Sequence, residues 1–202
     1  MDELELAIAA RGGDLNAFNR LVLIHQKLAY NLAYRILSDP SSAEDATQLA
    51  MIAAYNNIKG FRGGSFKAWL LRIVTNQCYD ELRRQKRQPR VSLEPVSQKD
   101  DEEIESPDWL ADDNPSPEET IVTAELETAI QHCLNDLPDE FRMIVVMVDV
   151  EGLDYMEVSR AINRPLGTVK SRLARARLRL QDCLREYQEL LPEKFRLEDE
   201  AE

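Results

Sequence analysis

Two stretches of the sequence gather basic side chains in patterns suited to binding nucleic acid. One is RPLGTVKSRLARARLRL at residues 164–180, where Lys and Arg surround a row of apolar residues. The other is FRGGSFKAWLLRIVTNQCYDELRRQKR at residues 61–87, where aromatic residues are interleaved with Arg and Lys. The 202-residue chain is acidic overall, with a formal net charge of −12. Local positive charge on such a chain indicates an anionic partner: nucleic acid, an acidic membrane surface, or an acidic groove of another protein.

The C-terminal basic stretch has the local features of a helix-turn-helix. Asp154 and Glu157 have the spacing of a capping box that starts a short helix, and a Pro/Gly corner follows at residues 163–167. The next helix has one apolar stripe, formed by Val169, Leu173, Ala176 and Leu180. This arrangement places one helix in the DNA major groove. The alternatives are a solvated surface helix, or a membrane or calmodulin-like target, which would require bulkier apolar residues.

The N-terminal basic stretch has the composition of a surface for unpaired bases. Aromatic rings stack on such bases while neighbouring cations bind the phosphate backbone. The glycine-rich loop beside it could receive a base turned out of its stack. The alternative is structural, with Phe66 and Trp69 as anchors in the core of a helical lobe.

The helices that must position these residues are indicated by apolar spacing and by capping residues. Candidate N-caps before residue 88 are Asp14, Ser41 or Ser42, and Ser65. These helices should extend to about residues 36, 58 and 87. Helical spacing resumes over residues 119–136, and Pro138 is expected at the first position of the next helix.

The composition changes between the two basic stretches. Residues 88–118 are rich in Asp, Glu and Pro and have no sustained apolar period, so they cannot bury enough surface to become ordered. We therefore expect an all-α chain of two small helical domains joined by an acidic flexible linker, the second containing the helix-turn-helix. The expected boundaries are residues 1–87, 88–118 for the linker, 119–186, and an acidic tail at 187–202.

Several classes of protein are not expected. Cys78, Cys133 and Cys183 are odd in number and far apart, which favours buried free thiols in a reducing cytoplasm. Metal binding is not expected, since His132 adjoins Cys133 and adjacent helical residues point about 100° apart. No nucleophile–base pair or phosphate loop indicates an enzyme, and no cofactor is expected. No apolar run approaches ~20 residues, and the acidic N-terminus is unlike a secretory signal, so we expect a cytoplasmic protein without stable membrane insertion.

Both lobes, in their order, resemble the extracytoplasmic-function (ECF) sigma factors of bacterial RNA polymerase. The resemblance is carried by SSAEDATQLAMIAAYNNI, FRGGSFKAWLLRIVTNQCYDELRRQKR, LPDEFRMIVVMVDVEGLDYMEV and RPLGTVKSRLARARLRL. It implies a dissociable subunit that joins core RNA polymerase and directs it to particular promoters. It further implies sigma region 2 before the linker, sigma region 4 after it, and an anti-sigma factor as a partner.

The same resemblance assigns roles to individual residues. The residues implied to contact duplex DNA at the −35 element are Arg164, Thr168, Lys170, Ser171, Arg172, Ala174 and Arg175. The residues implied to bind the −10 element and its melted strand are Phe61, Arg62, Phe66, Lys67, Trp69, Asn76, Tyr79, Asp80, Arg83 and Arg84. Polymerase binding is implied for Glu44, Asp45 and Gln48. Leu49 and Met51 depart from the Glu and the aromatic residue that the family commonly has there.

Two other functions stay open on the sequence alone. A stand-alone helix-turn-helix regulator would use the same basic helix, but such proteins commonly dimerise to match two half-sites and no dimerisation coil is evident. An all-helical adaptor would use the basic faces on acidic proteins. A sigma factor should bind core polymerase, whereas a stand-alone regulator should not. An adaptor should give no promoter-dependent transcription when it is added to core enzyme.

Overall fold

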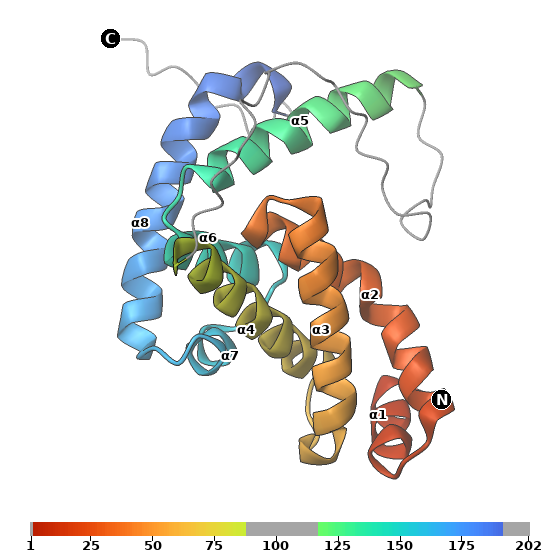
Figure 1. The fold of residues 1–202 in the computed structure, drawn as a ribbon. Coiled ribbons are helices and arrows are strands. Elements are labelled where there is room, and N and C mark those ends of the chain that lie inside the picture. Colours follow the sequence, from red (N-terminus) through yellow and green to blue (C-terminus); the bar gives the residue numbers. More distant parts are fainter. Residues whose placement is uncertain (1, 88–116, 192–202) are drawn as a thin grey trace.

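The computed structural model describes residues 2–87 and 117–191, and within those ranges it contains helices and turns but no strand. The first lobe consists of α1 (Glu3–Arg11), α2 (Leu15–Leu37), α3 (Pro40–Asn57), the 3-10 turn η1 (Ile58–Gly60) and α4 (Phe66–Arg87). The second consists of α5 (Pro117–Asn135), α6 (Asp139–Val145), the π-helical η3 (Val146–Val150), α7 (Tyr155–Ala161), α8 (Leu166–Leu184) and the 3-10 segment η4 (Arg185–Leu190). Figure 1 shows α5 of the second lobe across the top of the view and α8 along its left side.

The all-α prediction is confirmed for the described residues. The linker predicted at 88–118 lies outside them except for its last two positions, which belong to α5, and so does the tail beyond residue 191. None of the helices in the described ranges combines the length and apolar composition that crossing a bilayer requires.

Most helices begin where a side-chain oxygen accepts from otherwise unpaired N–H groups, as predicted. Asp14 caps α2, and the Ser65 hydroxyl accepts a hydrogen bond from the first turn of α4. Asp154 and Glu157 form the predicted capping box of α7, with N···O distances of 2.7 and 2.9 Å. The short helix of the helix-turn-helix is therefore fixed by its own sequence.

Two predicted helix starts are wrong by one to three residues. Asp39, rather than Ser41 or Ser42, caps α3, because Pro40 occupies the first turn and starts the helix earlier. Pro138 is the N-cap residue of α6 and not its first helical residue.

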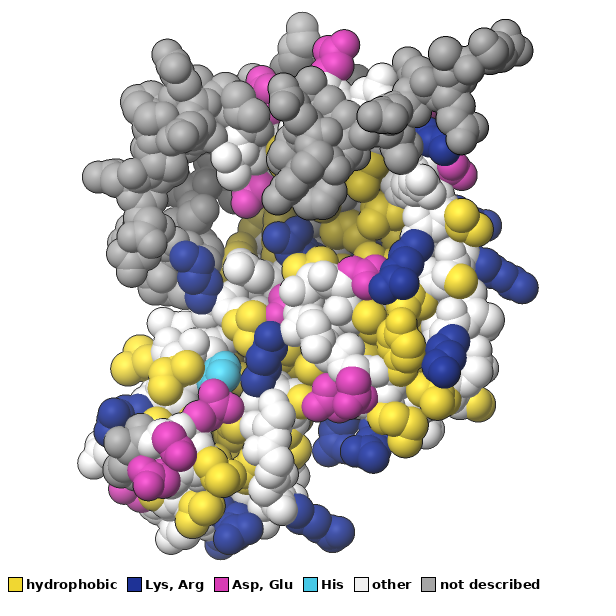
Figure 2. Space-filling model, turned by 180° about the vertical axis from the view of Figure 1, so that it is seen from behind, with side chains coloured by type: hydrophobic (Ala, Val, Ile, Leu, Met, Phe, Trp, Pro, Cys, Tyr) yellow, Lys and Arg dark blue, Asp and Glu magenta, His cyan; other side chains and the backbone are white. Residues whose placement is uncertain are grey.

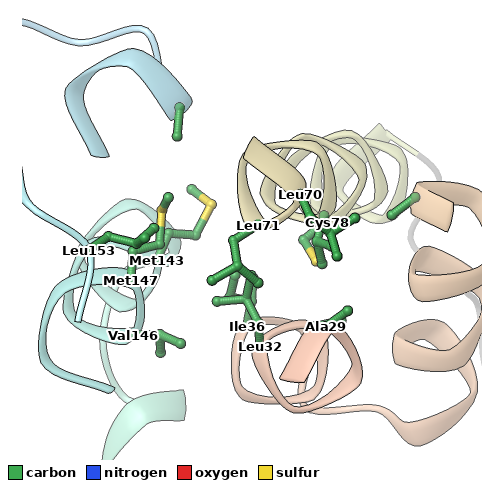
Figure 3. Close-up of a cluster of buried hydrophobic side chains, with 14 of the residues drawn as sticks. Ala29, Leu32, Ile36, Leu70, Leu71, Cys78, Met143, Val146, Met147 and Leu153 are labelled. Atoms are coloured by element: carbon green, nitrogen blue, oxygen red, sulfur yellow. The ribbon is translucent and has the colours of Figure 1, made fainter. Parts of the chain in front are cut away.

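The two lobes share one continuous apolar core. Leu32 and Ile36 of α2 and Leu71 of α4 face Met143 of α6 and Met147 of η3 (Figure 3). These five residues are at most 2% exposed. Since full burial of such a side chain is worth about 1.5–3 kcal/mol, the lobes are packed on each other and not merely tethered.

Arg142 of α6 joins the lobes through its guanidinium. Nη1 donates to the carbonyl of Ile36 at 2.8 Å, and Nη2 donates to the carbonyls of Asn135 and Leu137 at 3.0 and 3.3 Å. These acceptors lie at or just beyond the C-terminal ends of α2 and α5, where a positive charge also meets the helix dipoles. The residue is only 8% exposed, and this desolvation lowers the pKa of Arg142 while leaving it charged.

Two lysines of α4 also contact the second lobe. Lys67 Nζ donates to the carbonyl of Glu151 at 2.7 Å and lies 3.8 Å from its carboxylate. Lys86 Nζ lies 2.5 Å from the carboxylate of Asp139. Burial raises the pKa of Glu151, against the smaller opposing effect of Lys67. Both ends of α4 are thus bound to the second lobe.

The cysteines differ from the prediction. Cys78 is a buried free thiol, as predicted, and burial raises its pKa to about 12. Cys133 of α5 and Cys183 of α8 form a disulfide, with Cα atoms 5.7 Å apart. The prediction of free thiols is wrong for this pair because it relied on distance along the chain. The two residues are 50 positions apart, yet α5 packs on the C-terminal part of α8.

His25 of α2 gives the fold a pH dependence. Its Nε2 lies 3.2 Å from the Glu3 carboxylate, and its ring centroid lies 5.5 Å from that of Phe66. Desolvation lowers the pKa of His25 below 6.5, against the opposing effect of Glu3 and with a further small lowering by Lys67. The folded state therefore binds fewer protons than the unfolded state, so this stabilisation is present above pH 6.5 and is lost as the pH falls through the folded-state pKa.

We expect the free energy of unfolding to fall more steeply from about pH 7 to about pH 5 in the native protein than in His25→Asn. Urea denaturation followed by circular dichroism at several pH values measures both slopes. The comparison removes the contributions of other titrating groups, which both proteins share. Equal slopes would contradict the assignment to His25.

Candidate nucleic-acid interface

Helix α8 presents two faces of different character. Val169, Leu173 and Ala176 of the predicted stripe are at most 2% exposed, and Leu180 is half-buried. The exposed residues on the other side are Lys170, Ser171, Ala174 and Arg175. At positions i, i+1, i+4 and i+5 these four share one side of the helix. An exposed, basic, small-residue face in the first turns of a helix suits the major groove.

The other residues predicted at the −35 element are either paired with a neighbouring side chain or half-buried. Arg164 Nη2 lies 2.8 Å from Glu140 of α6, and Arg172 forms a second ion pair with the same carboxylate. Thr168 is half-buried in the first turn of α8. Both arginines flank the exposed face and would need to exchange Glu140 for a phosphate group.

Arg177 provides a contrast on the same helix. Its guanidinium makes a two-pronged contact with Asp149 of η3, with Nε···O and Nη2···O distances of 3.0 and 2.5 Å. This hydrogen bonding raises the pKa of Arg177 above its usual value. In Figure 2, Lys and Arg side chains are spaced along the edge where α8 lies. The basic side chains of α8 are thus not equivalent, because Arg177 is bound to Asp149 within the lobe, whereas Arg175 is exposed.

Three aromatic rings cluster at the N-terminal end of α4. Phe61, Phe66 and Trp69 contact one another with ring centroids 5.4–5.8 Å apart. Phe61 and Phe66 are only 2% and 3% exposed, so in this structure they are core residues and their predicted stacking on bases is not available. Trp69 is half-buried and keeps part of its ring at the surface.

Six of the residues predicted to bind the −10 element are exposed, in the loop before α4 or along that helix. They are Arg62, Asn76, Tyr79, Asp80, Arg83 and Arg84. The Arg83 guanidinium lies 5.8 Å from the centre of the Tyr79 ring. Arg84 pairs with Glu81 at 2.7 Å, which raises the pKa of Arg84, whereas Lys67 is bound to Glu151. Gly63 and Gly64 have φ of +93° and +88°, so the loop has a backbone conformation that favours glycine.

The two basic surfaces meet at a cleft of about 160 Å³. Asn76 and Tyr79 of α4 line one wall, and Arg164 and Arg172 line the other. The structure thus brings together residues that the sequence assigned to different DNA elements.

A second groove, of about 430 Å³, lies between α3 and α4. Its lining includes Asp45 and Gln48, which the family resemblance assigns to polymerase binding, and also Leu49 and Ile52. Leu49 and Ile52 are 54% and 58% exposed. Glu44 accepts a hydrogen bond from Gln48 at 3.1 Å on the same side of α3. Sequence reasoning missed Ile52, although an apolar residue three positions after Leu49 on a predicted helix indicated it.

One group of side chains in the described ranges could bind a metal ion: His132, Cys133 and Cys183, with ligand atoms within 4.8 Å of one another. The group lies at the C-terminal end of α8, away from its exposed basic face. A metal site was not expected from His132 and Cys133, because adjacent residues of α5 point in different directions; Cys183 of α8 is the third potential ligand.

Comparison with protein families gives two matches along the chain. Residues 21–88 match Sigma-70 region 2, and residues 127–180 match Sigma-70, region 4. The chain is 35% identical over 175 residues to the ECF RNA polymerase sigma factor SigW of Bacillus subtilis, covering 86% of this chain and 92% of that protein. It is 34% identical over 171 residues to the ECF RNA polymerase sigma factor SigE of Mycolicibacterium smegmatis, covering 85% of this chain and 63% of that protein.

Two solved structures share the fold. CnrH, in complex with the cytosolic domain of CnrY, superposes with a TM-score of 0.63 at 22% identity, covering 91% of this chain and 97% of that one. The sigma factor RpoE of Bartonella quintana, in complex with the anti-sigma factor NepR, superposes with a TM-score of 0.61 at 24% identity. The match covers 84% of this chain and 98% of that one. At these identities the likeness concerns the fold alone.

Proposed function

Because this chain belongs to the extracytoplasmic-function family of RNA polymerase sigma factors, and is an alternative sigma factor that directs transcription, we propose that its two lobes read different parts of the promoter. The second lobe reads duplex DNA at the −35 element through α8. The first lobe binds the −10 element and its melted strand through α4 and the loop at residues 61–65. The observation that carries this proposal is the exposed row of Lys170, Ser171, Ala174 and Arg175 opposite a buried stripe.

At the −35 element, Lys170 and Arg175 would donate hydrogen bonds to guanine edges, and Ala174 would contact a thymine methyl group. Arg164, Thr168 and Arg172 would bind phosphates and so set the register of the helix on the duplex. The surface supports this division because Lys170, Ala174 and Arg175 are exposed, whereas Arg164 and Arg172 are each paired with Glu140.

At the −10 element, Trp69 and Tyr79 are the rings with exposed surface that could stack on unpaired bases. Arg62, Lys67, Arg83 and Arg84 would bind the strand backbone, and Asn76 and Asp80 would hydrogen-bond base edges. Phe61 and Phe66, which are buried, would act indirectly by supporting the loop that receives a flipped base.

Reading both elements at once requires the lobes to separate. The positions that name the two elements, −35 and −10, differ by about 25 base pairs, or about 85 Å at about 3.4 Å per base pair. In the structure, residues assigned to both elements line one cleft of about 160 Å³. We therefore propose that this closed arrangement opens when the protein joins core polymerase on a promoter.

The groove between α3 and α4 is the proposed binding surface for core polymerase. We expect Leu49→Arg and Ile52→Glu each to weaken binding to core polymerase about 10-fold, because each places a charge on an apolar, solvent-exposed contact; arginine is used at position 49 because the family commonly has Glu there. Fluorescence anisotropy of labelled protein titrated with core enzyme measures this. Leu23→Glu is the matched control, since Leu23 is an exposed leucine of α2, at 66% exposure. Loss of binding in the control, or none in either groove variant, would contradict the assignment.

We further propose the cytoplasm as the site of action and an anti-sigma factor as a partner. One structural neighbour, RpoE of Bartonella quintana, is a sigma factor in complex with the anti-sigma factor NepR, which supports the second proposal.

Run-off transcription with core polymerase across a promoter library tests the whole proposal. We expect core enzyme plus this protein to initiate at a subset of promoters, and core enzyme alone to initiate at none of them. In gel shifts, the isolated protein should bind the same DNA poorly at physiological salt. Tight, sequence-selective binding by the isolated protein, with no effect on core enzyme, would instead identify a stand-alone regulator.

A further inference from the structure

The Cys133–Cys183 pair lies in a setting that a structural disulfide alone does not account for. Cys133 is 1% exposed, Cys183 is half-buried, and the exposed imidazole of His132 stands beside them. The ligand atoms of these three residues all lie within 4.8 Å of one another. A dithiol with a neighbouring imidazole is the donor set that zinc prefers.

Further contacts position the imidazole. The His132 ring centroid lies 6.0 Å from that of Tyr187 in η4, and Nδ1 lies 3.8 Å from the carboxylate of Asp136, one turn further along α5. A carboxylate near a ring nitrogen commonly orients a metal-binding histidine.

We propose that Cys133, Cys183 and His132 form a zinc site that exists only when the two cysteines are reduced. A dithiol reductant opens the disulfide by exchange: two electrons pass to the protein, which gains two thiols, and the reductant becomes the disulfide. Zinc then binds both sulfur atoms as thiolates with release of two protons, and it takes a nitrogen of His132 as its third protein ligand. A fourth position stays open to water.

The geometry allows both states with little movement of the backbone. Two thiolates on one tetrahedral zinc ion lie about 3.8 Å apart, given bonds of about 2.3 Å, which is close to the contact distance of non-bonded sulfur atoms. The Cα atoms, 5.7 Å apart, already suit two cysteines that share a partner. Zinc or disulfide would each fasten α5 to the end of α8 and so brace the helix that carries the basic face. The reduced, metal-free protein is the state without this connection.

Zinc titration of the full-length protein tests the site. The protein is reduced with a phosphine, freed of metal, and titrated with Zn²⁺ in competition with a chromogenic chelator. We expect one zinc ion per chain for the reduced protein and none at this site for the oxidised protein. Cys133→Ser and Cys183→Ser should weaken binding at least about 100-fold, and His132→Asn about 10-fold or more. Cys78→Ala is the matched control and should bind as the native protein does.

A second readout separates loss of the site from loss of the fold. Cobalt substitution should give thiolate-to-metal charge-transfer absorption in the native protein and in Cys78→Ala but not in Cys133→Ser. Circular dichroism should show the same helix content in all variants. One result that would overturn the proposal is a reduced native protein that takes up no zinc from the chelator. Zinc binding that is unchanged in Cys133→Ser, Cys183→Ser or His132→Asn would overturn it as well.

Discussion

Replacing Arg142 with alanine should lower the free energy of unfolding by about 3 kcal/mol and let the two lobes separate. The guanidinium donates to three carbonyls, those of Ile36, Asn135 and Leu137, in a position that is only 8% exposed. Alanine leaves these acceptors without their donor and removes the positive charge beside the C-terminal end of α2. A charged, buried hydrogen-bonding group lost in this way is among the costliest single substitutions.

Urea denaturation measures the loss of stability, and small-angle X-ray scattering measures the separation of the lobes. Arg160→Ala is the matched control, because Arg160 of α7 is exposed, and it should change neither quantity appreciably. Arg142→Lys should show an intermediate loss, since it keeps the charge but lacks the planar fork that reaches several acceptors. A native radius of gyration in Arg142→Ala, together with unchanged stability, would show that the apolar contacts alone close the lobes.

Features fixed by local physics could be predicted from the sequence. The capping box of Asp154 and Glu157 and the buried stripe of α8 depend on spacing within one or two turns, and both are present. The start of α3 was missed because Asp39 and Ser42 are equally acceptable caps, and Pro40 decides between them. The π-helical turn of η3 was missed because an unbroken apolar run carries no periodic signal for such an irregularity.

Features that depend on packing between distant segments could not be predicted. Phe61 and Phe66 have the composition of a stacking surface; a core role was left open for Phe66 and not considered for Phe61, and their exposures of 2% and 3% show that both are core residues. The Cys133–Cys183 pair requires the crossing of α5 and α8. Arg142 did leave a signal, as a lone cation at the start of the apolar run RMIVVMV. A charge in that position must find partners, although the sequence does not say which.

Arg175→Ala should reduce transcription from a −35-dependent promoter by about 5- to 150-fold. This range follows from the 1–3 kcal/mol that a bidentate arginine–guanine contact is worth. The reason lies in the exposed face of α8: Arg175 is directed to solvent beside Ala174 and one turn after Ser171. Since the side chain makes no contribution to the buried stripe, the stability of the fold should be unchanged.

Arg177→Ala on the same helix distinguishes base reading from general positive charge. It removes the same charge two residues away, but Arg177 is held by Asp149, with an Nη2···O distance of 2.5 Å, and faces η3. If α8 reads bases through one face, Arg177→Ala should retain most of the run-off product, and Arg175→Ala alone should lose discrimination against a substituted −35 base. If the helix acted only as a band of positive charge, both variants would lose activity to the same extent and with the same dependence on salt. Run-off assays of both variants on matched and substituted promoters, at two salt concentrations, decide between these outcomes.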